Sequence, residues 1–267
     1  MAHGKYLTYA GYLHLDELLS LQREQSGEGG DPEHDEMLFI IIHQVYELWF
    51  KQLLHELEFA RDRMGADDMP RLLHTMGRIL TILKVQVHQL AILESIRTLE
   101  FLAFRQRLEV ASGMQSYQFR ELEFILGHKR RDVFDRYPEG SDARRRLDSR
   151  YGEPSLWAAF LRFLHAHGYA IPAEDLERDV TAPTEPSAGV RAALIRLYRE
   201  DPQLVQLCER FVDLDEGLQE WRYRHVKMVE RTIGARPGTG QTGGAAYLRT
   251  SLNRPVFPDL WAIRTDL

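Results

Sequence analysis

Cysteine is nearly absent from this chain: Cys208 is the only one among its 267 residues. A single thiol cannot form an internal disulfide or a zinc site built from several cysteines, and it suits a reducing compartment. Its sequence neighbours are mostly apolar, which indicates inert packing in a core.

Long apolar runs and an excess of basic residues are also missing. A membrane span needs about 20 apolar residues, but the longest run, Met37–Val45, already contains His43 and is soon followed by Glu47 and Lys51. The first residues, Met1–Lys5, lack the apolar segment of a signal peptide. A net charge of −6 argues against a surface that binds nucleic acid regardless of sequence. We therefore expect a cytoplasmic protein that binds neither membranes nor nucleic acid.

Sustained strand-like alternation is the third absence, and helical periodicity dominates instead. Asp31-Pro32 and Asp201-Pro202 are typical helix starts, because aspartate caps free backbone N–H groups and proline suits the first turn. We predict an all-α fold in which a bundle of long helices encloses a pocket. The predicted helices cover about residues 31–64, 69–97, 101–111, 117–126 and 202–234.

Residues 129–200 differ in composition from the long helices on either side. Charged residues crowd together there, and five prolines interrupt the segment: Pro138, Pro154, Pro172, Pro183 and Pro186. We predict a single domain over residues 1–267, with a small helical subdomain at 129–200 within it.

Several familiar metal and nucleotide motifs are incomplete. A di-iron bundle needs Glu-x-x-His pairs, and no glutamate here is followed by histidine three positions later. His55-Glu56 lacks the second histidine of a zinc-protease motif. Gly238–Gly243 matches the GxGxxG nucleotide fingerprint, which functions only between a strand and a helix. We interpret it as a flexible loop that closes over a polar ligand, with a plain linker as the alternative.

One histidine, His225, falls on the apolar side of a predicted helix. Arg222, Arg224, Lys227 and Glu230 are expected to point elsewhere. A buried histidine needs a partner for its ring nitrogen, since an unpaired buried polar group costs roughly 1–3 kcal/mol. A carbonyl, a carboxylate or a metal would serve, and spacing alone favours an ordinary hydrogen bond. The residues that share this side are Leu218, Trp221, His225, Met228, Val229 and Thr232.

A second histidine, His43, lies in the apolar segment Phe39–Gln44. Taken alone, it is best explained as a hydrogen-bonded core residue. Two histidines on the apolar sides of two long helices, however, suit opposite faces of a flat apolar cofactor such as haem. Arg105, one turn after Phe101, would add a guanidinium suited to a carboxylate, although a surface arginine is the simpler interpretation.

The remaining histidines carry no motif of their own. His74 and His88 fit core positions, and the others are expected on the surface: His3, His14, His34, His128, His165 and His167.

Taken together, these segments resemble the tryptophan 2,3-dioxygenase family, over nearly the full length and in the same order. Each motif alone is moderately specific, and their order makes the resemblance highly specific. The segments are Leu7–Leu13, Phe39–Gln44, Tyr46–Lys51, Phe101 with Phe104-Arg105, Ala111–Ser116, Gln118–Arg120 and Trp221–Gly244.

The resemblance implies a haem b cofactor, one per subunit and ferrous in the active form. His225 is then the axial ligand of the haem iron, and His43 accepts a hydrogen bond from the indole N–H. The implied reaction inserts both atoms of O2 across the indole C2–C3 bond of L-tryptophan and gives N-formylkynurenine, the first step of the kynurenine route. Two alternatives are an oxygenase on the same scaffold that acts on a modified tryptophan or another indole, inserting either one oxygen atom or both, and a haem sensor without catalysis.

The resemblance also implies how the amino acid is held. Arg105 pairs with the substrate carboxylate, and Thr239 helps to hold the carboxylate and ammonium groups. Phe39 and Phe101 pack on the indole ring.

The family's quaternary structure is implied as well. Tyr9, Tyr12 and Leu13 belong to a segment that completes the pocket of a neighbouring subunit in a homotetramer, a dimer of dimers. Three residues differ from the family pattern, namely Gln241, Met114 and Leu99. We expect these differences to affect substrate identity more than haem binding.

Overall fold

The computed structural model describes residues 6–27, 32–240 and 243–267, and this part of the chain contains helices and loops but no strand. The all-α prediction is therefore confirmed. The α-helices are α1 (Tyr9–Leu13), α2 (Leu15–Leu18), α3 (His34–Gly65), α4 (Met69–Leu93), α5 (Thr98–Arg105), α6 (Tyr117–Ile125), α7 (Asp142–Tyr151), α8 (Leu156–Ala166), α9 (Ala173–Leu176), α10 (Ala188–Glu200), α11 (Pro202–Ile233), α12 (Ala245–Arg249) and α13 (Pro258–Ala262). Short 3-10 turns are η1 (Gln106–Leu108), η2 (Gly113–Gln115), η3 (Arg131–Arg136) and η4 (Ile263–Thr265).

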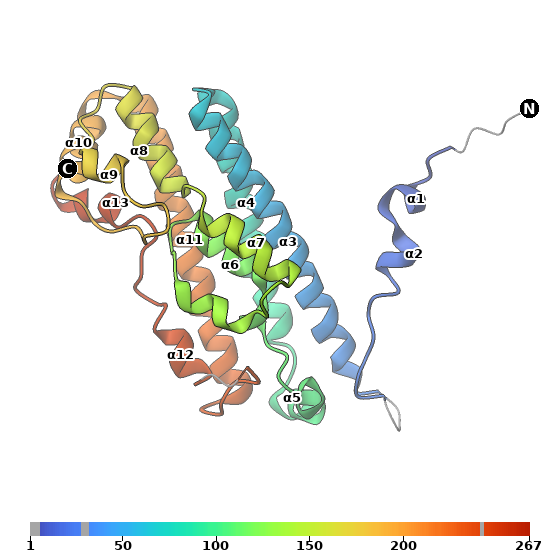
Figure 1. The fold of residues 1–267 in the computed structure, drawn as a ribbon. Helices are drawn as coiled ribbons and strands as arrows, with labels where there is room; N and C mark the ends of the chain where they lie inside the picture. The colour runs from blue at the N-terminus through green and yellow to red at the C-terminus, as the bar shows by residue number, and fades with distance from the viewer. Residues whose placement is uncertain (1–5, 28–31, 241–242) are drawn as a thin grey trace, which may run out of the picture.

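Three long helices, α3, α4 and α11, form the centre of the bundle (Figure 1). α4 packs along both α3 and α11. The start of α11 is the predicted one, because Pro202 occupies its first turn and the Asp201 carboxylate accepts hydrogen bonds from the N–H groups of Gln203 and Leu204, both at 3.0 Å. All three helices bury apolar faces in one continuous core.

Three predicted helices differ from the structure at their ends. The helix predicted at 101–111 is α5, Thr98–Arg105, followed by the 3-10 turn η1, Gln106–Leu108. α3 begins at His34, whereas the predicted cap Asp31 lies outside the described residues. α4 ends at Leu93 rather than near Arg97, because the chain turns by 88° there into α5. Arg97 has extended backbone angles and caps α5, so it cannot continue α4.

Residues 129–200 contribute to two hydrophobic clusters. α8 and α10 belong to the main core. η3 and α7 surround a smaller second cluster made of Phe124, Val133, Phe134, Tyr137 and Leu147. Whether this segment is a subdomain stays a prediction.

The C-terminal segment is fixed to α11 by Asp215, which is fully buried. Its carboxylate accepts hydrogen bonds from the N–H groups of Val256 and Phe257 and from Trp261 Nε1, at 2.8–2.9 Å. These bonds hold α13 against the half of α11 that precedes His225.

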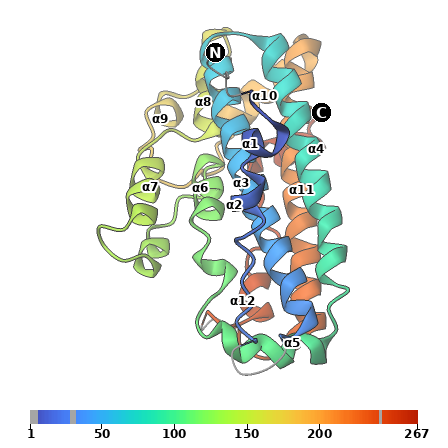
Figure 2. The same cartoon turned by 90° about the vertical axis from the view of Figure 1, so that its right-hand side faces the viewer.

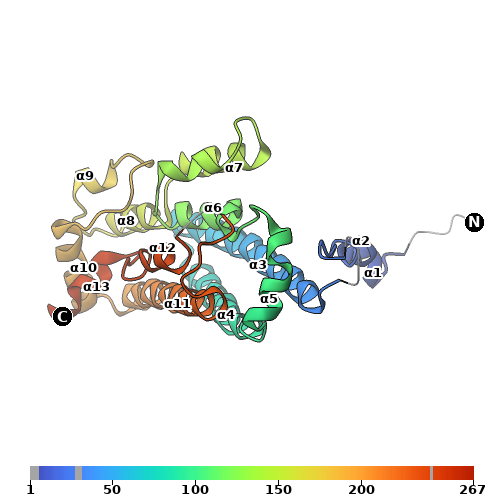
Figure 3. The same ribbon diagram turned by 90° about the horizontal axis from the view of Figure 1, so that it is seen from below.

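The N-terminal residues 6–27, here called the arm, precede α3 and attach to it only through residues near their carboxyl end. α1 and α2 project away from α3 in two perpendicular views (Figures 1 and 3), and in Figure 2, which is seen from the side of the arm, they lie in front of α3. The large side chains of Tyr9 and Tyr12 are 76% and 67% exposed.

No single described helix is both long and apolar enough to cross a membrane. One bent pair, Met69–Leu93 with Thr98–Leu108, reaches the required length and composition only when its two parts are taken together.

Candidate functional site

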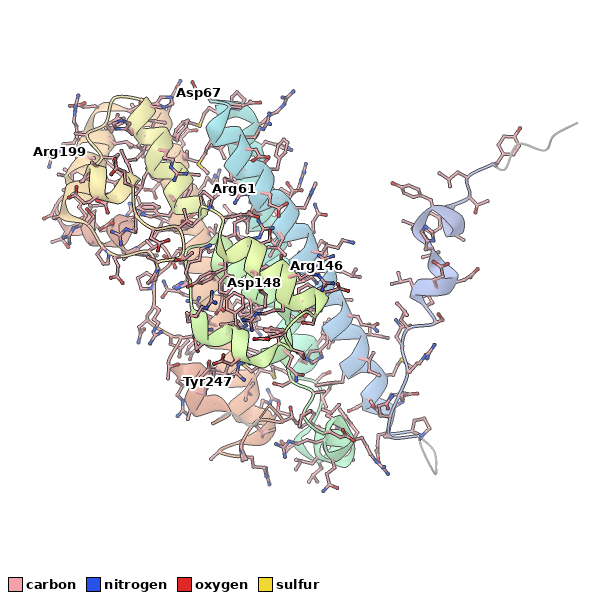
Figure 4. All side chains as sticks on the ribbon, in the orientation of Figure 1. Arg61, Asp67, Arg146, Asp148, Arg199 and Tyr247 are labelled. Carbon is pink, nitrogen blue, oxygen red and sulfur yellow. The ribbon has the colours of Figure 1, made fainter. Side chains whose placement is uncertain are left out.

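A cavity of about 330 Å³ lies among α3, α5, α6, α11 and α12. These elements meet at the end of the bundle where α5 and α12 lie, and Figure 4 labels Tyr247 of the cavity wall on α12. Six of the predicted site residues line this one cavity: Phe39, His43, Phe101, Arg105, His225 and Thr239. The other three, Tyr9, Tyr12 and Leu13, lie on the arm and do not reach the cavity of their own chain.

His43 is held in one orientation by its own helix. Its Nδ1 lies 2.6 Å from the carbonyl oxygen of Phe39, one turn earlier on α3. Since a carbonyl only accepts, Nδ1 carries the proton and Nε2 is left as an acceptor in the neutral ring. Burial lowers the pKa of His43, although the Phe39 carbonyl and Glu47 act in the opposite direction. The imidazole is therefore neutral at neutral pH.

His225 is neutral for the same reason. Burial, and secondarily the proximity of His43, lowers its pKa to about 4. The ring stacks on Trp221, with centroids 5.0 Å apart and planes 10° apart. Neither ring nitrogen forms a hydrogen bond with any described residue, so the carbonyl or carboxylate that spacing alone favoured is not found there. A neutral imidazole with a free lone pair is the form that binds a metal.

Apolar side chains form the walls between the two histidines. The stripe predicted for α11 is only partly buried, because most of it faces this cavity: Trp221, His225, Met228, Val229 and Thr232. From α3 and α5, Phe39 and Phe101 meet with ring centroids 5.7 Å apart. Walls of this kind exclude water and favour an aromatic ring.

Arg105 and Thr239 lie where the loop after α11 meets the loop after α5. An Nη2 group of Arg105 donates to the carbonyl of Pro237, and Thr239 Oγ1 donates to the carbonyl of Ala111 at 2.7 Å. The loop is tightly placed, since a Cβ on Gly240 would lie 2.8 Å from the side chain of Ser112. The Arg105 partner is an uncharged carbonyl, and no carboxylate among the described residues pairs with this guanidinium.

The three departures from the family pattern differ in position. Met114 lines the cavity, whereas Leu99 is 80% exposed and does not. Gln241 lies outside the described residues.

A group of arginines in the cavity was not predicted: Arg120, Arg130, Arg222 and Arg254. Arg120 and Arg130 share one carboxylate, Glu123, at 2.6 and 3.2 Å, and Arg120 Nε has no partner among the described residues. Burial lowers the pKa of Arg222. Arg254 is exposed, whereas Arg120, Arg130 and Arg222 are at least partly buried and outnumber the carboxylates that act on them, Glu123 and Asp215. An excess of buried positive charge favours an anion in this part of the wall.

Two expectations about this wall were wrong. Arg222 was expected to point away from the stripe, but it is three positions before His225 and so lies only about 60° around the helix from it. His128 was expected on the surface, but it lines the cavity and its Nε2 is buried without a partner among the described residues. No sequence motif marks either residue. His128 reaches the cavity only through the packing of α6 against α3, whereas Arg222 reaches it through its angular position on α11.

The other histidines in the described part of the chain do not line the cavity. His74 and His88 are exposed on the outer side of α4 and not in the core. His14, His34, His165 and His167 are exposed as expected, and His3 lies outside the described residues.

Comparison with known proteins agrees with this geometry. The profile of the family described as tryptophan 2,3-dioxygenase matches residues 2–167 and 185–267. The tryptophan 2,3-dioxygenase of Herpetosiphon aurantiacus is 55% identical over 98% of both chains. That of Anaeromyxobacter sp. (strain K) is 51% identical over 100% of this chain and 98% of its own, and tryptophan 2,3-dioxygenase 1 of Ralstonia nicotianae is 40% identical over 100% and 90%. The chain belongs to the tryptophan 2,3-dioxygenase family.

The cavity fits the flat cofactor implied for the tryptophan 2,3-dioxygenase family. Haem brings most of its iron's ligands itself, so the protein would need to supply only a neutral imidazole. Among the described residues no three His, Cys, Asp or Glu side chains gather to hold a bare metal ion. The lone-pair nitrogen of His225 and the positive wall around Arg120 match, respectively, an iron atom and the two carboxylates of haem.

The burial of His128 gives a pH dependence to stability. Burial, then the charge of Arg222, lowers its pKa from an ordinary 6.5 to about 4. Between these values the unfolded chain binds more protons than the folded one, so stability present above pH 6.5 is lost as the pH falls toward 4.

The substitution His128→Asn removes this titrating group. The decrease in the free energy of unfolding of the apoprotein between pH 7 and pH 5 should then be smaller by about 2 kcal/mol. Urea unfolding at pH 7 and pH 5 measures these free energies, and His165→Asn, at an exposed histidine, is the control. If both substitutions change the pH dependence equally, His128 is not buried in the folded protein.

Proposed function

We propose that this protein is a haem-dependent tryptophan 2,3-dioxygenase that converts L-tryptophan and O2 into N-formylkynurenine. The observation that carries the proposal is the meeting of His43, His225 and Arg105 on one cavity, in a chain of this family. No atom leaves in this reaction: both oxygen atoms enter the product as the indole C2–C3 bond is cleaved.

The residues that would hold haem b belong to two parts of the cavity. His225 would supply the axial nitrogen, and the positive wall around Arg120 and Arg222 would hold the haem carboxylates. When bound, haem in its ferrous form supplies the iron chemistry that activates O2. The His225 imidazole and Arg120 Nε support this assignment, because neither has a hydrogen-bond partner within the described part of the chain.

The substrate would be oriented at its two ends. His43 Nε2 is free to accept the indole N–H, because Nδ1 already donates to Phe39. At the other end, the substrate carboxylate would replace the Pro237 carbonyl as the partner of Arg105, since a charged acceptor binds guanidinium more strongly than a neutral one. Thr239 would add a hydroxyl contact. Fixing both ends places the C2–C3 bond without requiring His43 to act as a strong base.

The walls and the loop would keep water away from the reaction. Phe39 and Phe101 would pack against the indole, and the loop that carries Thr239 already contacts Ala111 and Ser112. A dry cavity strengthens each polar contact made inside it.

The active form would be a homotetramer, a dimer of dimers. Tyr9, Tyr12 and Leu13 are exposed on an arm that stands away from its own bundle, which suits insertion into a neighbouring copy. The cytoplasmic location expected from the sequence stays a prediction.

The reaction itself is tested with labelled oxygen. Ferrous protein incubated with L-tryptophan and ¹⁸O₂ should give N-formylkynurenine with both oxygen atoms labelled, as measured by mass spectrometry. A product with one labelled atom, or turnover only of a modified indole, would favour the alternative oxygenase that acts on a different indole. Met114, which departs from the family pattern and lines the cavity, is the reason to consider that alternative. Binding of L-tryptophan without turnover would favour a sensor, although a sensor has no need of Arg105 and Thr239.

The axial ligand is tested by His225→Ala. This variant should lose most of its haem, because the His225 imidazole would be the protein's main specific attachment to the iron. Haem content per chain and the Soret band of the purified protein measure it, with exposed His88→Ala as the control. A fully loaded His225→Ala protein with the wild-type Soret band would remove the assignment.

The carboxylate partner is tested by Arg105→Ala. Loss of a charged hydrogen bond of about 1.5–3 kcal/mol should raise KM for L-tryptophan roughly 10- to 100-fold, with haem content unchanged. Steady-state kinetics measure it against Arg107→Ala, an exposed arginine two positions later. If both variants keep the wild-type KM, Arg105 does not bind the substrate.

A further inference from the structure

The arm meets the rest of its chain only near its carboxyl end. Residues 6–20 form hydrogen bonds only with residues up to Gln22, within the described part of the chain. Tyr6 and Leu7 are 91% and 76% exposed. The direction of α1 and α2 therefore depends on how the next few residues attach to α3.

Glu36 makes the principal attachment. Its side chain is almost fully buried, and its two carboxylate oxygens accept the N–H groups of Gln25 at 2.9 Å and Ser26 at 2.8 Å. The Ser26 hydroxyl also donates to Glu36, and its oxygen accepts the N–H of Glu33 at 2.8 Å. Charge-assisted bonds to two consecutive backbone N–H groups fix the orientation of the peptide, not only its distance.

A second attachment lies two turns further along α3. Gln44 accepts from Gln22 Nε2 at 2.6 Å, and Gln44 Nε2 donates to the carbonyl of Leu21 at 3.2 Å. With Glu36, this holds residues 21–26 along the first turns of the helix at two points. The arm therefore leaves the bundle in one defined direction.

The attachment and the cavity share one helix. Glu36, Phe39 and His43 occupy positions i, i+3 and i+7 of α3, which fall on the same side of a helix. The element that carries the neutral imidazole of one subunit is thus also the element that sets the path of its arm.

We infer that Glu36 is a positioning residue for the neighbouring subunit: its carboxylate directs the arm so that Tyr9, Tyr12 and Leu13 enter a second copy's cavity. This inference rests on the arm exchange proposed above. It adds a residue that touches neither substrate nor haem but sets the substrate affinity of the adjacent site.

Two variants test the attachment. Glu36→Gln keeps the shape of the side chain but loses its charge and places an amide N–H group opposite backbone donors. Ser26→Ala removes the hydroxyl without changing a buried residue of α3. It therefore tests the same attachment even if Glu36→Gln does not fold. The control is Glu33→Gln, because the side chain of Glu33 is exposed and takes no part in the attachment.

Arm placement is measured directly by cross-linking. The native cysteine, Cys208, is fully buried, so a cysteine placed at exposed Tyr6 is the reactive thiol for a benzophenone maleimide. Irradiation of the haem-loaded protein should give a covalent dimer in the Tyr6→Cys background. Adding Glu36→Gln should lower its yield about 10-fold, the factor expected for loss of a charged hydrogen bond, while Glu33→Gln leaves it unchanged.

Kinetics give the second readout. In the background with native Tyr6, Glu36→Gln and Ser26→Ala should each raise KM for L-tryptophan several-fold, because the arm of the neighbouring subunit completes the pocket less often. The kcat should stay within about twofold of wild type, and the Soret band should not change. An unchanged KM together with an unchanged dimer yield in Glu36→Gln would overturn the role of Glu36 while leaving arm exchange intact. Absence of any cross-linked dimer in the Tyr6→Cys background would overturn arm exchange and the inference together, whatever the turnover.

Discussion

Two imidazoles, His43 on α3 and His225 on α11, remain uncharged because the bundle removes them from water. Desolvation is the largest influence on both rings, and His43 further disfavours a proton on His225. A protonated His225 has no lone pair for a metal, and a protonated His43 cannot accept an indole N–H. The remaining features of the site depend on keeping this pair neutral and close together.

The long helices supply that constraint. α4 packs against both α3 and α11, and Asp215 fixes the C-terminal segment to α11, so the two histidine-bearing helices cannot easily separate. Most charged groups of the cavity belong to the Arg105 loop and to the arginine wall around Glu123, and burial outweighs the effect of nearby Glu47 on His43. One cavity can therefore combine neutral chemistry at its centre with anion binding at its edges.

Helical periodicity was enough to predict the long helices and the positions of His43 and His225, because a stripe three or four residues apart needs no tertiary information. Asp201-Pro202 marked the start of α11 for an equally local reason. The roles assigned to the site residues came from resemblance to a family and remain proposals.

The arginine wall and His128 could not be predicted, because they come together only when α6 and α12 pack beside α11. Arg222 shows the difficulty best. It is polar, so the pattern placed it outside the stripe, although its angular position beside His225 brings it to the cavity. The end of α4 was misjudged for a similar reason, since the turn into α5 carries no glycine or proline signal.

The central claim is that His225 and His43 face a haem on which L-tryptophan is oriented. An absorption spectrum of the haem-loaded protein, taken before and after addition of L-tryptophan, tests it most directly. We predict a Soret band of histidine-bound haem that shifts when L-tryptophan is added. A spectrum of free haem, or a bound-haem spectrum that L-tryptophan leaves unchanged at saturating concentration, would contradict the account.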